Sequence, residues 1–427
     1  MLRSLKEPGA FGEIMGNRHF IVIGAGIVGV STALYLQKDG NQVTVIDGRD
    51  PGEGTSKGNA SIIASEAVVP IATPGIIWDV PKMLMDPLGP LAIRWSYLPK
   101  IAPWLLRFVA ASSEKRVEKI SIALQSVLTH ALASHKQLAS LAGQPMMIKD
   151  TGVLAVFETD KKFDSYKSDF ALMERRGIKF QTLKQEELRQ FEPSLQPIYR
   201  HGVYYPENSF VTDNFALVQR LAHQFTAGGG KIVKADVSGF EIGPEGPTAV
   251  KAGGNTYPCD AVVVAAGAWS KKLTAMLGHN VPLDTERGYH VTLPNAQKRP
   301  RMPLYSADHS FAITPLDVGL RFAGTVELGG LDLPPNYDRA QKLMNHGKRM
   351  FGDLDETGRT DWMGFRPSMP DSVPVISQGG RFKNTFFGYG HGHIGLTLGP
   401  VTGRIIADMA AGRDPGVDLA PFRVDRF

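Results

Sequence analysis

Cysteine and long apolar runs are nearly absent from this sequence. Cys259 is the only cysteine among 427 residues, so no disulfide can form within the chain, and this usage favours a reducing compartment. The most apolar helical stretch, residues 101–109, is short and contains Pro103 and Arg107. It is too short to cross a bilayer, so we expect it to pack on the core, with contact to a membrane surface as the less favoured alternative.

The chain also lacks a strong excess of either charge. Its 47 Lys and Arg residues are scattered among 42 Asp and Glu residues, which gives a net charge of +5 without a basic block. We therefore expect no nucleic-acid partner, and a modest attraction for anionic substrates or a membrane surface stays open. The histidines do not fall at ligand spacing beside carboxylates or thiols, so we expect no metal site.

The most informative pattern runs from His19 to Asp47. Two apolar runs, 19–23 and 43–46, flank a glycine turn and a helical stretch, and the second run ends in the acid. This order is typical of a dinucleotide-binding βαβ unit, in which the turn and the helix N-terminus bind phosphates and the acid binds a ribose. The alternative is an ordinary crossover without a ligand. The turn consists of Gly24, Ala25, Gly26, Ile27, Val28 and Gly29.

A loop rich in glycine and small polar residues follows Asp47. It leaves the carboxyl end of the second strand, where ligands of open α/β sheets bind. Hydroxyl groups in this loop can donate hydrogen bonds to phosphates, and its last part can lie along a flat ring. A plain solvated loop is the alternative. The candidate cofactor contacts are Gly48, Thr55, Ser56, Asn59, Ala60 and Ser61.

Two further glycine turns lie far along the chain. An apolar strand at 260–265 runs into one, and a strand at 384–389 runs into the other, ahead of a helix at 398–411. One ligand that touches all three turns must be long and buried, which favours FAD over NAD. The added candidate contacts are Val237, Ala266, Gly267, Trp269, Gly390, His391, Gly392 and Ile394.

The rest of the chain predicts a second domain. Residues 75–143 are expected to be helical, 281–332 to form an antiparallel sheet with one covered face, and the proline-rich residues 364–376 to form a loop. The fold class is therefore α/β, with a Rossmann-like βαβ FAD-binding domain and an inserted α+β substrate domain that contains a mixed, largely antiparallel sheet. We expect the first domain to comprise 18–80, 200–275 and 360–420, the second 81–199 and 276–359, and residues 1–17 to be a loose extension without a signal peptide.

Several segments together carry a resemblance to a known family. They are GAGIVGVSTALYL with VID, GTSKGNAS, VVVAAGAWS, ERGYHVTL, GLRFAGTVE, GFRPSMPDSVPVI and GYGHGHIGLTLGP. Over nearly the whole chain after residue 17, they resemble the glycine-oxidase and D-amino-acid-dehydrogenase branch of the flavin-dependent amine oxidoreductases. The sequence departs from the dehydrogenase pattern in its N-terminal extension, at Arg287, where that group often has lysine, and at Ser61.

The resemblance implies FAD as cofactor and oxidation of a D-amino acid to an imine, which water hydrolyses to a 2-oxo acid and ammonia. A hydride would leave the substrate Cα for the flavin N5, and the electrons would pass to a quinone, another carrier or a partner subunit. The resemblance also implies that Gly395, Leu396 and Thr397 meet the pyrimidine edge of the flavin.

The chemistry of this reaction selects candidate catalytic residues. A guanidinium suits a substrate carboxylate, because two parallel charge-assisted hydrogen bonds fix its position and tilt. Arg366, in the expected proline-braced loop, is the first candidate, Arg287 is the second, and Tyr289 could add a hydroxyl. His391 lies between two glycines and could poise the amine or steady charge on the reduced flavin. A surface or structural role is the alternative for each.

The motifs leave other functions open. An oxygen-using amine oxidase of glycine or sarcosine type, a D-hydroxyproline dehydrogenase and an FAD-holding subunit of a hetero-oligomeric dehydrogenase fit them too. An NAD-dependent dehydrogenase fits less well, because it leaves the two later glycine turns unused. We expect a cytoplasmic protein, with peripheral contact to the inner membrane as an alternative.

Overall fold

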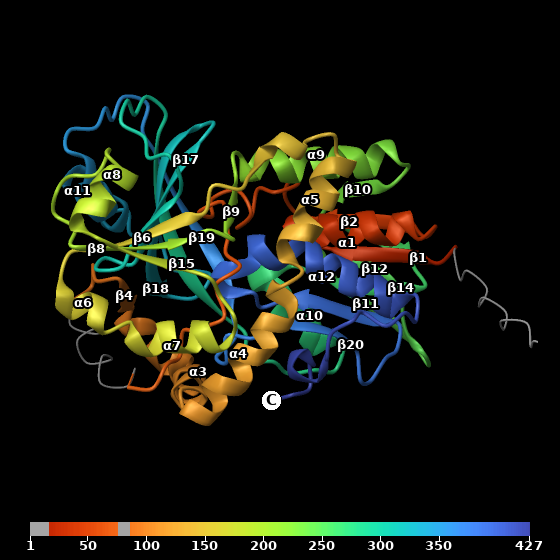
Figure 1. The fold of residues 1–427 in the computed structure, drawn as a ribbon. Coiled ribbons are helices and arrows are strands. Elements are labelled where there is room, and N and C mark those ends of the chain that lie inside the picture. Colours follow the sequence, from red (N-terminus) through yellow and green to blue (C-terminus); the bar gives the residue numbers. More distant parts are fainter. Residues whose placement is uncertain (1–16, 76–85) are drawn as a thin grey trace, which may run out of the picture.

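The computed structural model describes residues 17–75 and 86–427. The expected N-terminal extension up to residue 16, and the part of the expected helical region at 76–85 that contains Trp78, lie outside the described residues. The described chain forms a mainly parallel sheet beside a larger mixed sheet, shown at the right and left of Figure 1.

The parallel sheet is built around the predicted βαβ unit. β1 (His19–Ile23) pairs in parallel with β2 (Gln42–Asp47) and with β14 (Ala261–Val264), and α1 (Ile27–Lys38) connects the first two strands. The prediction of strand, glycine turn, helix, strand and acid is therefore confirmed. The sheet is completed by β10 (Lys231–Lys234), β21 (Thr385–Tyr389) and the antiparallel edge strand β20 (Val375–Gln378), in the order β10-β2-β1-β14-β21-β20.

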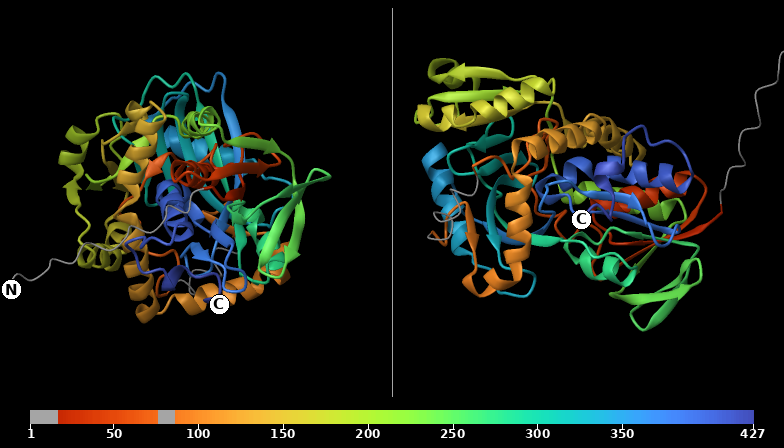
Figure 2. Two further views of the ribbon diagram at one scale, coloured as in Figure 1. Left: turned by 90° about the vertical axis from the view of Figure 1, so that its right-hand side faces the viewer. Right: turned by 90° about the horizontal axis from the view of Figure 1, so that it is seen from below.

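Both faces of this sheet are covered, which explains why its strands are almost continuously apolar. One face packs against α1 and against α12 (Gly395–Ala410), which lies along α1. The helices α5 (Ala131–Leu141) and α9 (Asn214–Ala227) extend this layer. The opposite face packs against α10 (Ser270–Met276) and a small antiparallel sheet, seen below the sheet in the right view of Figure 2. That small sheet contains β11 (Val237–Gly243), β12 (Gly246–Ala252) and β13 (Asn255–Pro258).

The larger sheet has nine strands and is mostly antiparallel, as the alternating pattern at 281–332 predicts. One face packs against α11 (Asp338–Phe351). Its strand order is β19 (Thr360–Ser368), β15 (Asp284–Leu293), β18 (Gly319–Leu328), β17 (Phe311–Leu316), β16 (Leu304–Ser306), β6 (Val153–Phe157), β8 (His201–Tyr205) and β7 (Gln181–Lys184), with β4 (Leu91–Ile93) paired to β18. β8 thus belongs to this sheet, although we placed residues from 200 onward in the nucleotide-binding domain.

One expectation is wrong at a position that matters for the site. Residues 364–368 are not part of a loop, because Arg366 and Pro367 lie in β19 and pair with Glu286 and Thr285 of β15. β19 is an edge strand, and an edge strand tolerates a proline because its missing N–H faces away from the sheet.

The remaining elements frame these sheets. A second small sheet has the order β3-β9-β5. It contains β3 (Ile62–Ile63), β9 (Ser209–Val211) and β5 (Ile148–Lys149). The other helices are α3 (Leu98–Ala111), α4 (Glu114–Leu128), α6 (Asp160–Asp164), α7 (Lys167–Arg175) and α8 (Gln185–Phe191).

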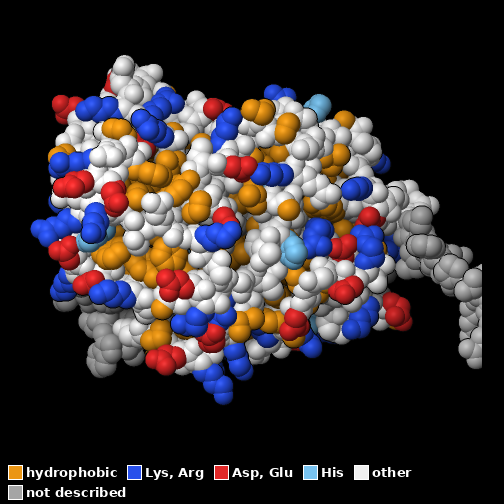
Figure 3. Space-filling view, in the orientation of Figure 1, with side chains coloured by type: hydrophobic (Ala, Val, Ile, Leu, Met, Phe, Trp, Pro, Cys, Tyr) orange, Lys and Arg blue, Asp and Glu red, His pale blue; other side chains and the backbone are white. Residues whose placement is uncertain are grey.

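The surface carries both signs of charge side by side. On the face in Figure 3, acidic and basic side chains are interspersed and hydrophobic side chains lie between them. Among the helices of the described residues, none has the length and apolar character needed to cross a membrane.

Candidate functional site

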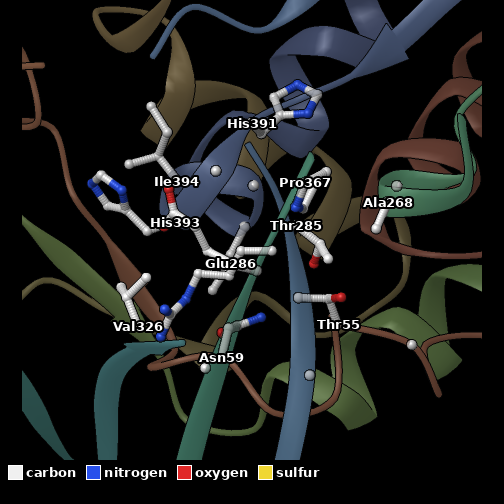
Figure 4. A pocket seen from close by; sticks show the side chains of 18 of the residues that line it. Thr55, Asn59, Ala268, Thr285, Glu286, Val326, Pro367, His391, His393 and Ile394 are labelled. Carbon is white, nitrogen blue, oxygen red and sulfur yellow. The ribbon is translucent and has the colours of Figure 1, made fainter. Parts of the chain in front are cut away.

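A cavity of about 1730 Å³ lies between the two large sheets. Its wall includes the glycine turn after β1 at one end and residues of β15, β18 and β19 at the other. Pockets for small ligands usually measure about 300–1,000 Å³, so this cavity has room for a dinucleotide together with a second, smaller molecule. Figure 4 shows Glu286, Val326 and His393 around one part of the cavity and Thr55 and Ala268 towards another.

The glycine turn after β1 is shaped by close backbone contacts. Gly24 has φ +111°, and a Cβ atom there would lie 2.4 Å from the carbonyl oxygen of Ala265. A Cβ at Gly29 would lie 1.8 Å from the carbonyl oxygen of Gly24, so this glycine lets α1 pack directly on the turn. At Gly26, a Cβ would reach the Ser56 hydroxyl at 3.1 Å. The turn therefore leaves a bare backbone surface at the helix N-terminus, which fits a pyrophosphate.

Asp47 is fixed at the end of β2. The backbone N–H of Ala25 donates to its Oδ2 at 2.7 Å, and the N–H of Arg49 donates to its Oδ1 at 2.9 Å. The Arg49 guanidinium stacks over the Trp269 ring at 4.5 Å. Asp47, Arg49 and Trp269 all line the cavity, so this end offers a held carboxylate and an aromatic ring, as a nucleoside requires.

The loop after β2 is held in shape by two residues that the sequence did not point to. Arg321 of β18 donates to the carbonyls of Lys57 and Asn59 at 3.3 and 3.0 Å. Asn214, at the start of α9, donates to the carbonyl of Lys57 at 3.0 Å and accepts from the Ser61 hydroxyl at 2.6 Å. Both are buried. Their side chains meet the loop only in the folded chain, so no local sequence signal marks them.

The predicted hydroxyl contacts of this loop are already engaged by protein. The Ser56 Oγ accepts from the N–H of Ile27 at 3.0 Å, and the Thr55 hydroxyl donates to the carbonyl of Phe365 at 2.7 Å. Ser61 has φ +60°, a left-handed conformation that places the chain for β3. Thr55, Ser56, Asn59, Ala60 and Ser61 all line the cavity.

The first residues of α12 are hydrogen-bonded to the segment around β3, across the cavity wall. The Thr397 Oγ1 accepts from the N–H of Ala64 at 3.1 Å, and its hydroxyl lies 3.3 Å from the Ile62 carbonyl. His135 of α5 contacts the Leu396 carbonyl through Nε2 at 2.7 Å, and burial lowers the pKa of His135 to about 4. His391 contacts the Thr402 hydroxyl at 2.9 Å, and burial lowers its pKa to about 3. Both imidazoles are therefore neutral at pH 7.

Arg366 is the only one of the two candidate arginines that faces the cavity. It lies opposite Glu286 in the β15–β19 register, and its Nη1 donates to the Thr325 carbonyl at 2.8 Å. Burial lowers the pKa of the Arg366 guanidinium and raises that of the Glu286 carboxyl, with the opposite charge acting against burial in each case. Nearby, burial and then the charge of Arg366 lower the pKa of His393 to about 4.

Arg287 points to the other face of β15. Its guanidinium donates to the carbonyls of Gly330, Leu333 and Pro334 at 2.8, 2.6 and 3.1 Å, and it lies 3.6 Å from Glu327. It is fully buried and does not belong to the cavity wall. Its donors hold residues 330–334, which favours the structural alternative.

The other predicted residues differ in whether they line the cavity. The Tyr289 hydroxyl donates to Glu327 Oε2 at 2.7 Å and accepts from the N–H of Asn336 at 2.9 Å, although Tyr289 touches the cavity wall. Gly29 and Gly390 shape their turns without lining the cavity. The cavity wall does include Gly48, Val237, Ala266, Gly267, Gly392, Ile394, Gly395, Leu396 and Thr397. Within the described residues, no group of three or more His, Cys, Asp or Glu side chains could hold a metal ion.

Comparisons with known proteins agree with this geometry. Residues 19–409 match the family described as DAO, FAD dependent oxidoreductase. The chain is 42% identical over 417 residues to a protein named D-amino-acid oxidase from Bradyrhizobium diazoefficiens, with 96% of this chain and 99% of that protein covered. It is 30% identical over 419 residues to a protein named D-amino acid dehydrogenase from Paramagnetospirillum magneticum, with 95% and 98% covered.

A solved structure shows the same fold. Glycine oxidase from Geobacillus kaustophilus superposes with a TM-score of 0.74 at 19% identity, and the match covers 97% of this chain and 100% of that one. The expected α/β fold class is therefore confirmed.

Proposed function

This chain belongs to the DAO family of FAD-dependent oxidoreductases, and on that premise we propose that it oxidises a D-amino acid to the 2-oxo acid and ammonia through an imine. The expected cofactor, FAD, is confirmed by this membership. When bound, FAD supplies the acceptor for the hydride that leaves the substrate Cα.

The cavity fits this cofactor in two places. The bare turn at Gly24 and Gly26 would hold the pyrophosphate, and the carboxylate of Asp47 would bind the adenosine ribose. At the other end, the backbone of residues 395–397 at the start of α12 would hold the pyrimidine edge, since the first N–H groups of a helix have no intrahelical partner.

The orientation of Arg366 carries the proposal. Its half-buried guanidinium lines the cavity wall, and among residues 17–75 and 86–427 no acidic side chain forms a salt bridge with it within 4.0 Å. The hydrogen bonds that it makes go to the carbonyls of Gly324 and Thr325 through its two terminal nitrogens. Glu286 lies opposite Arg366 in the register but forms no salt bridge with it. Donors of the guanidinium that no carboxylate holds can bind a substrate carboxylate, and a fixed carboxylate orients the Cα–H bond of the substrate.

Two buried histidines near the start of α12 add no charge to the site. His391 and His135 are neutral at pH 7, because burial holds their pKa values near 3 and 4. Neutral imidazoles do not compete with Arg366 for the substrate carboxylate. The substrate amine must lose its proton before the hydride leaves, and uncharged neighbours do not hold it in the ammonium form.

We propose a carrier such as a quinone as the electron acceptor, in the manner of a dehydrogenase. Oxygen is the second candidate, favoured because the relative named as an oxidase is more similar to this chain than the relative named as a dehydrogenase. Peroxide measured during turnover in air separates the two. One peroxide for each amino acid consumed would exclude the dehydrogenase version.

The reaction itself is tested by anaerobic bleaching of the flavin. The holoenzyme is mixed in the absence of oxygen with D- and L-amino acids, including both isomers of proline and of hydroxyproline. We expect the D series to bleach the flavin and the L series to leave it yellow. A flavin that stays yellow with every D-amino acid contradicts the proposed function and supports the alternative of a subunit that only holds FAD.

A further inference from the structure

The floor of the cavity beyond Arg366 is a row of small side chains on one face of the nine-stranded sheet. Ala323 of β18, Ala312 of β17 and Ala155 of β6 lie in this row, because Ala323 pairs directly with Ala312, and one residue of β16 pairs with both Ala312 and Ala155. Opposite residues on paired strands point to the same face. All three line the cavity, so this part of the wall is flat and open.

A tyrosine interrupts the row. Tyr305 of β16 stands between Ala312 and Ala155 in the same register and lines the cavity. β16 lies two strands from β18, which places its backbone about 10 Å from the strand whose carbonyls hold Arg366. An amino acid whose carboxylate is bound by Arg366 therefore has room for a long side chain across the alanines, towards Tyr305.

Two more tyrosines and a carboxylate close this end of the cavity. Tyr166 and Tyr205 line it together with Glu66, which follows β3. Burial, then the charge of Glu66, raises the pKa of Tyr205, so the two side chains are neighbours. The segment is fixed by the N–H of Ser65, which donates to Asn208 Oδ1 at 3.0 Å.

Within residues 17–75 and 86–427, the carboxylate of Glu66 forms no salt bridge with a basic side chain, and its Oε2 atom is buried without a hydrogen-bond partner. Burial raises the pKa of Glu66 to about 7, against the opposing effects of its own backbone N–H and of the Asn208 side chain. A carboxylate in this setting gains from a cationic partner. Of the other charged residues on this part of the wall, Lys162 lies over the Tyr166 ring at 5.2 Å and Asp308 accepts from the N–H of Glu158 at 2.8 Å.

We propose that Glu66 binds the cationic end of the substrate's side chain, so that the preferred substrates are basic D-amino acids such as D-lysine. A long unbranched side chain crosses the flat alanine floor, its methylene groups lie among the tyrosine rings, and its ammonium pairs with the buried carboxylate. This inference rests on the proposed function, since Arg366 must bind the carboxylate at the other end.

The test compares D-lysine with D-norleucine, which has the same chain without the terminal ammonium. We expect kcat/KM of the wild-type holoenzyme to favour D-lysine by about tenfold or more, because a charge-assisted hydrogen bond to a buried carboxylate is lost in D-norleucine. In Glu66→Gln, which keeps the shape and loses the charge, this ratio should fall towards one. In Glu66→Asp, which restores the charge, it should recover in part.

Binding without turnover gives a second readout. 6-Aminohexanoate and hexanoate carry the carboxylate but no α-amine, so they cannot be oxidised, and their binding is followed by the change in flavin absorbance. The wild-type protein should bind 6-aminohexanoate about tenfold more tightly, and Glu66→Gln should bind both alike. This comparison holds for the wild type even if a variant fails to fold.

The outcomes separate this inference from the proposed function. If apolar D-amino acids bleach the flavin and the wild type prefers D-norleucine to D-lysine, the role of Glu66 is wrong and the proposed function stands. The same conclusion follows if Glu66→Gln keeps the wild-type ratio. If no D-amino acid bleaches the flavin, the proposed function and the role of Glu66 are both wrong.

Discussion

The guanidinium of Arg366 lies directly over the Cα atom of Gly288. A Cβ atom at residue 288 would lie 2.3 Å from Nη2 and 2.4 Å from Cζ of Arg366. Gly288 is thus the position on β15 that lets the neighbouring strand's arginine fold back over the sheet. The direction of the guanidinium depends on this missing side chain as much as on Arg366 itself.

Gly288→Ala should therefore impair the site without removing any functional group. The new methyl group must push the guanidinium away, and a displacement of about 1 Å at an orienting residue can cost about a hundredfold in rate. We expect kcat/KM for the D-amino acid to fall by about ten- to a hundredfold, with normal flavin content. Steady-state kinetics and the flavin absorbance of the purified variant check this, and an unchanged kcat/KM would contradict it.

Arg366→Ala should leave FAD bound and weaken the substrate severely. Truncating one partner of a buried charge pair costs about 2–5 kcal/mol, so kcat/KM should fall by about 30- to 4,000-fold. Arg366→Lys keeps the charge but lacks the planar fork, so its kcat/KM should lie between those of the wild type and of Arg366→Ala. Anaerobic substrate titrations measure the effect. Bleaching with wild-type affinity in Arg366→Ala would show that the carboxylate binds elsewhere.

Arg287→Met should reduce the stability of the fold and leave substrate binding nearly unchanged, in contrast to Arg366→Ala. The loss of this guanidinium leaves the carbonyls of Gly330, Leu333 and Pro334 without their donor. It also removes one of the two arginines near Glu327, which keeps its ion pair with Arg94 at 2.6 Å. We expect the free energy of unfolding to fall by about 3–5 kcal/mol, while the substrate KM of the folded enzyme changes little. Denaturant titration and kinetics on one preparation test both halves. A large rise in KM at unchanged stability would show that Arg287 contributes to substrate binding.

Gly24→Ala should abolish cofactor binding. The new alanine would have to adopt a φ of +111°, and its Cβ atom would lie 2.4 Å from the carbonyl oxygen of Ala265. Gly229→Ala is the matched control, because Gly229 has φ +90° and open space around it. The control carries only the backbone strain of about 1 kcal/mol and should keep its flavin. The flavin absorbance per polypeptide measures the difference, and equal flavin content in the two variants would contradict the tight-turn interpretation.

The sequence predicts the parts of this protein whose signal is local. The unit from His19 to Asp47, the strand at 261–264 and the turn before α12 each combine apolar periodicity with glycines at fixed positions, and the structure contains all three. The strand that carries Arg366 was missed because Pro367 signals a loop, and only its place at the edge of a sheet makes the proline acceptable.

The supporting contacts could not be predicted, because they join residues that are distant in sequence. Arg321 and Asn214 hold the loop after β2, and His135 holds the Leu396 carbonyl, from positions 264, 157 and 261 residues away from the groups they contact. An arginine, an asparagine or a histidine in a strand or helix has no local feature that distinguishes such a role from an exposed one. Glu66 is a similar case, since its burial becomes visible only when Tyr205 lies beside it.

Acid should destabilise the fold through its buried neutral histidines. Burial lowers the pKa of His135 to about 4 and those of His290 and His391 to about 3. In the unfolded chain each histidine has the ordinary pKa of about 6.5, so below that pH the unfolded state binds more protons than the folded one. Stability is therefore full above pH 6.5 and falls as the pH drops from 6.5 towards the folded values.

The size of this effect can be measured one histidine at a time. Each histidine should cost about 2 kcal/mol between pH 7 and pH 5, because one pKa unit corresponds to about 1.4 kcal/mol. His135→Gln keeps a donor for the Leu396 carbonyl and removes the titrating group, so its free energy of unfolding at saturating FAD should lose about 2 kcal/mol less over this range than the wild type. His223→Gln, at an exposed position of α9, is the control and should follow the wild-type curve. If His135→Gln also follows the wild-type curve, His135 does not enter the folded state as a neutral side chain.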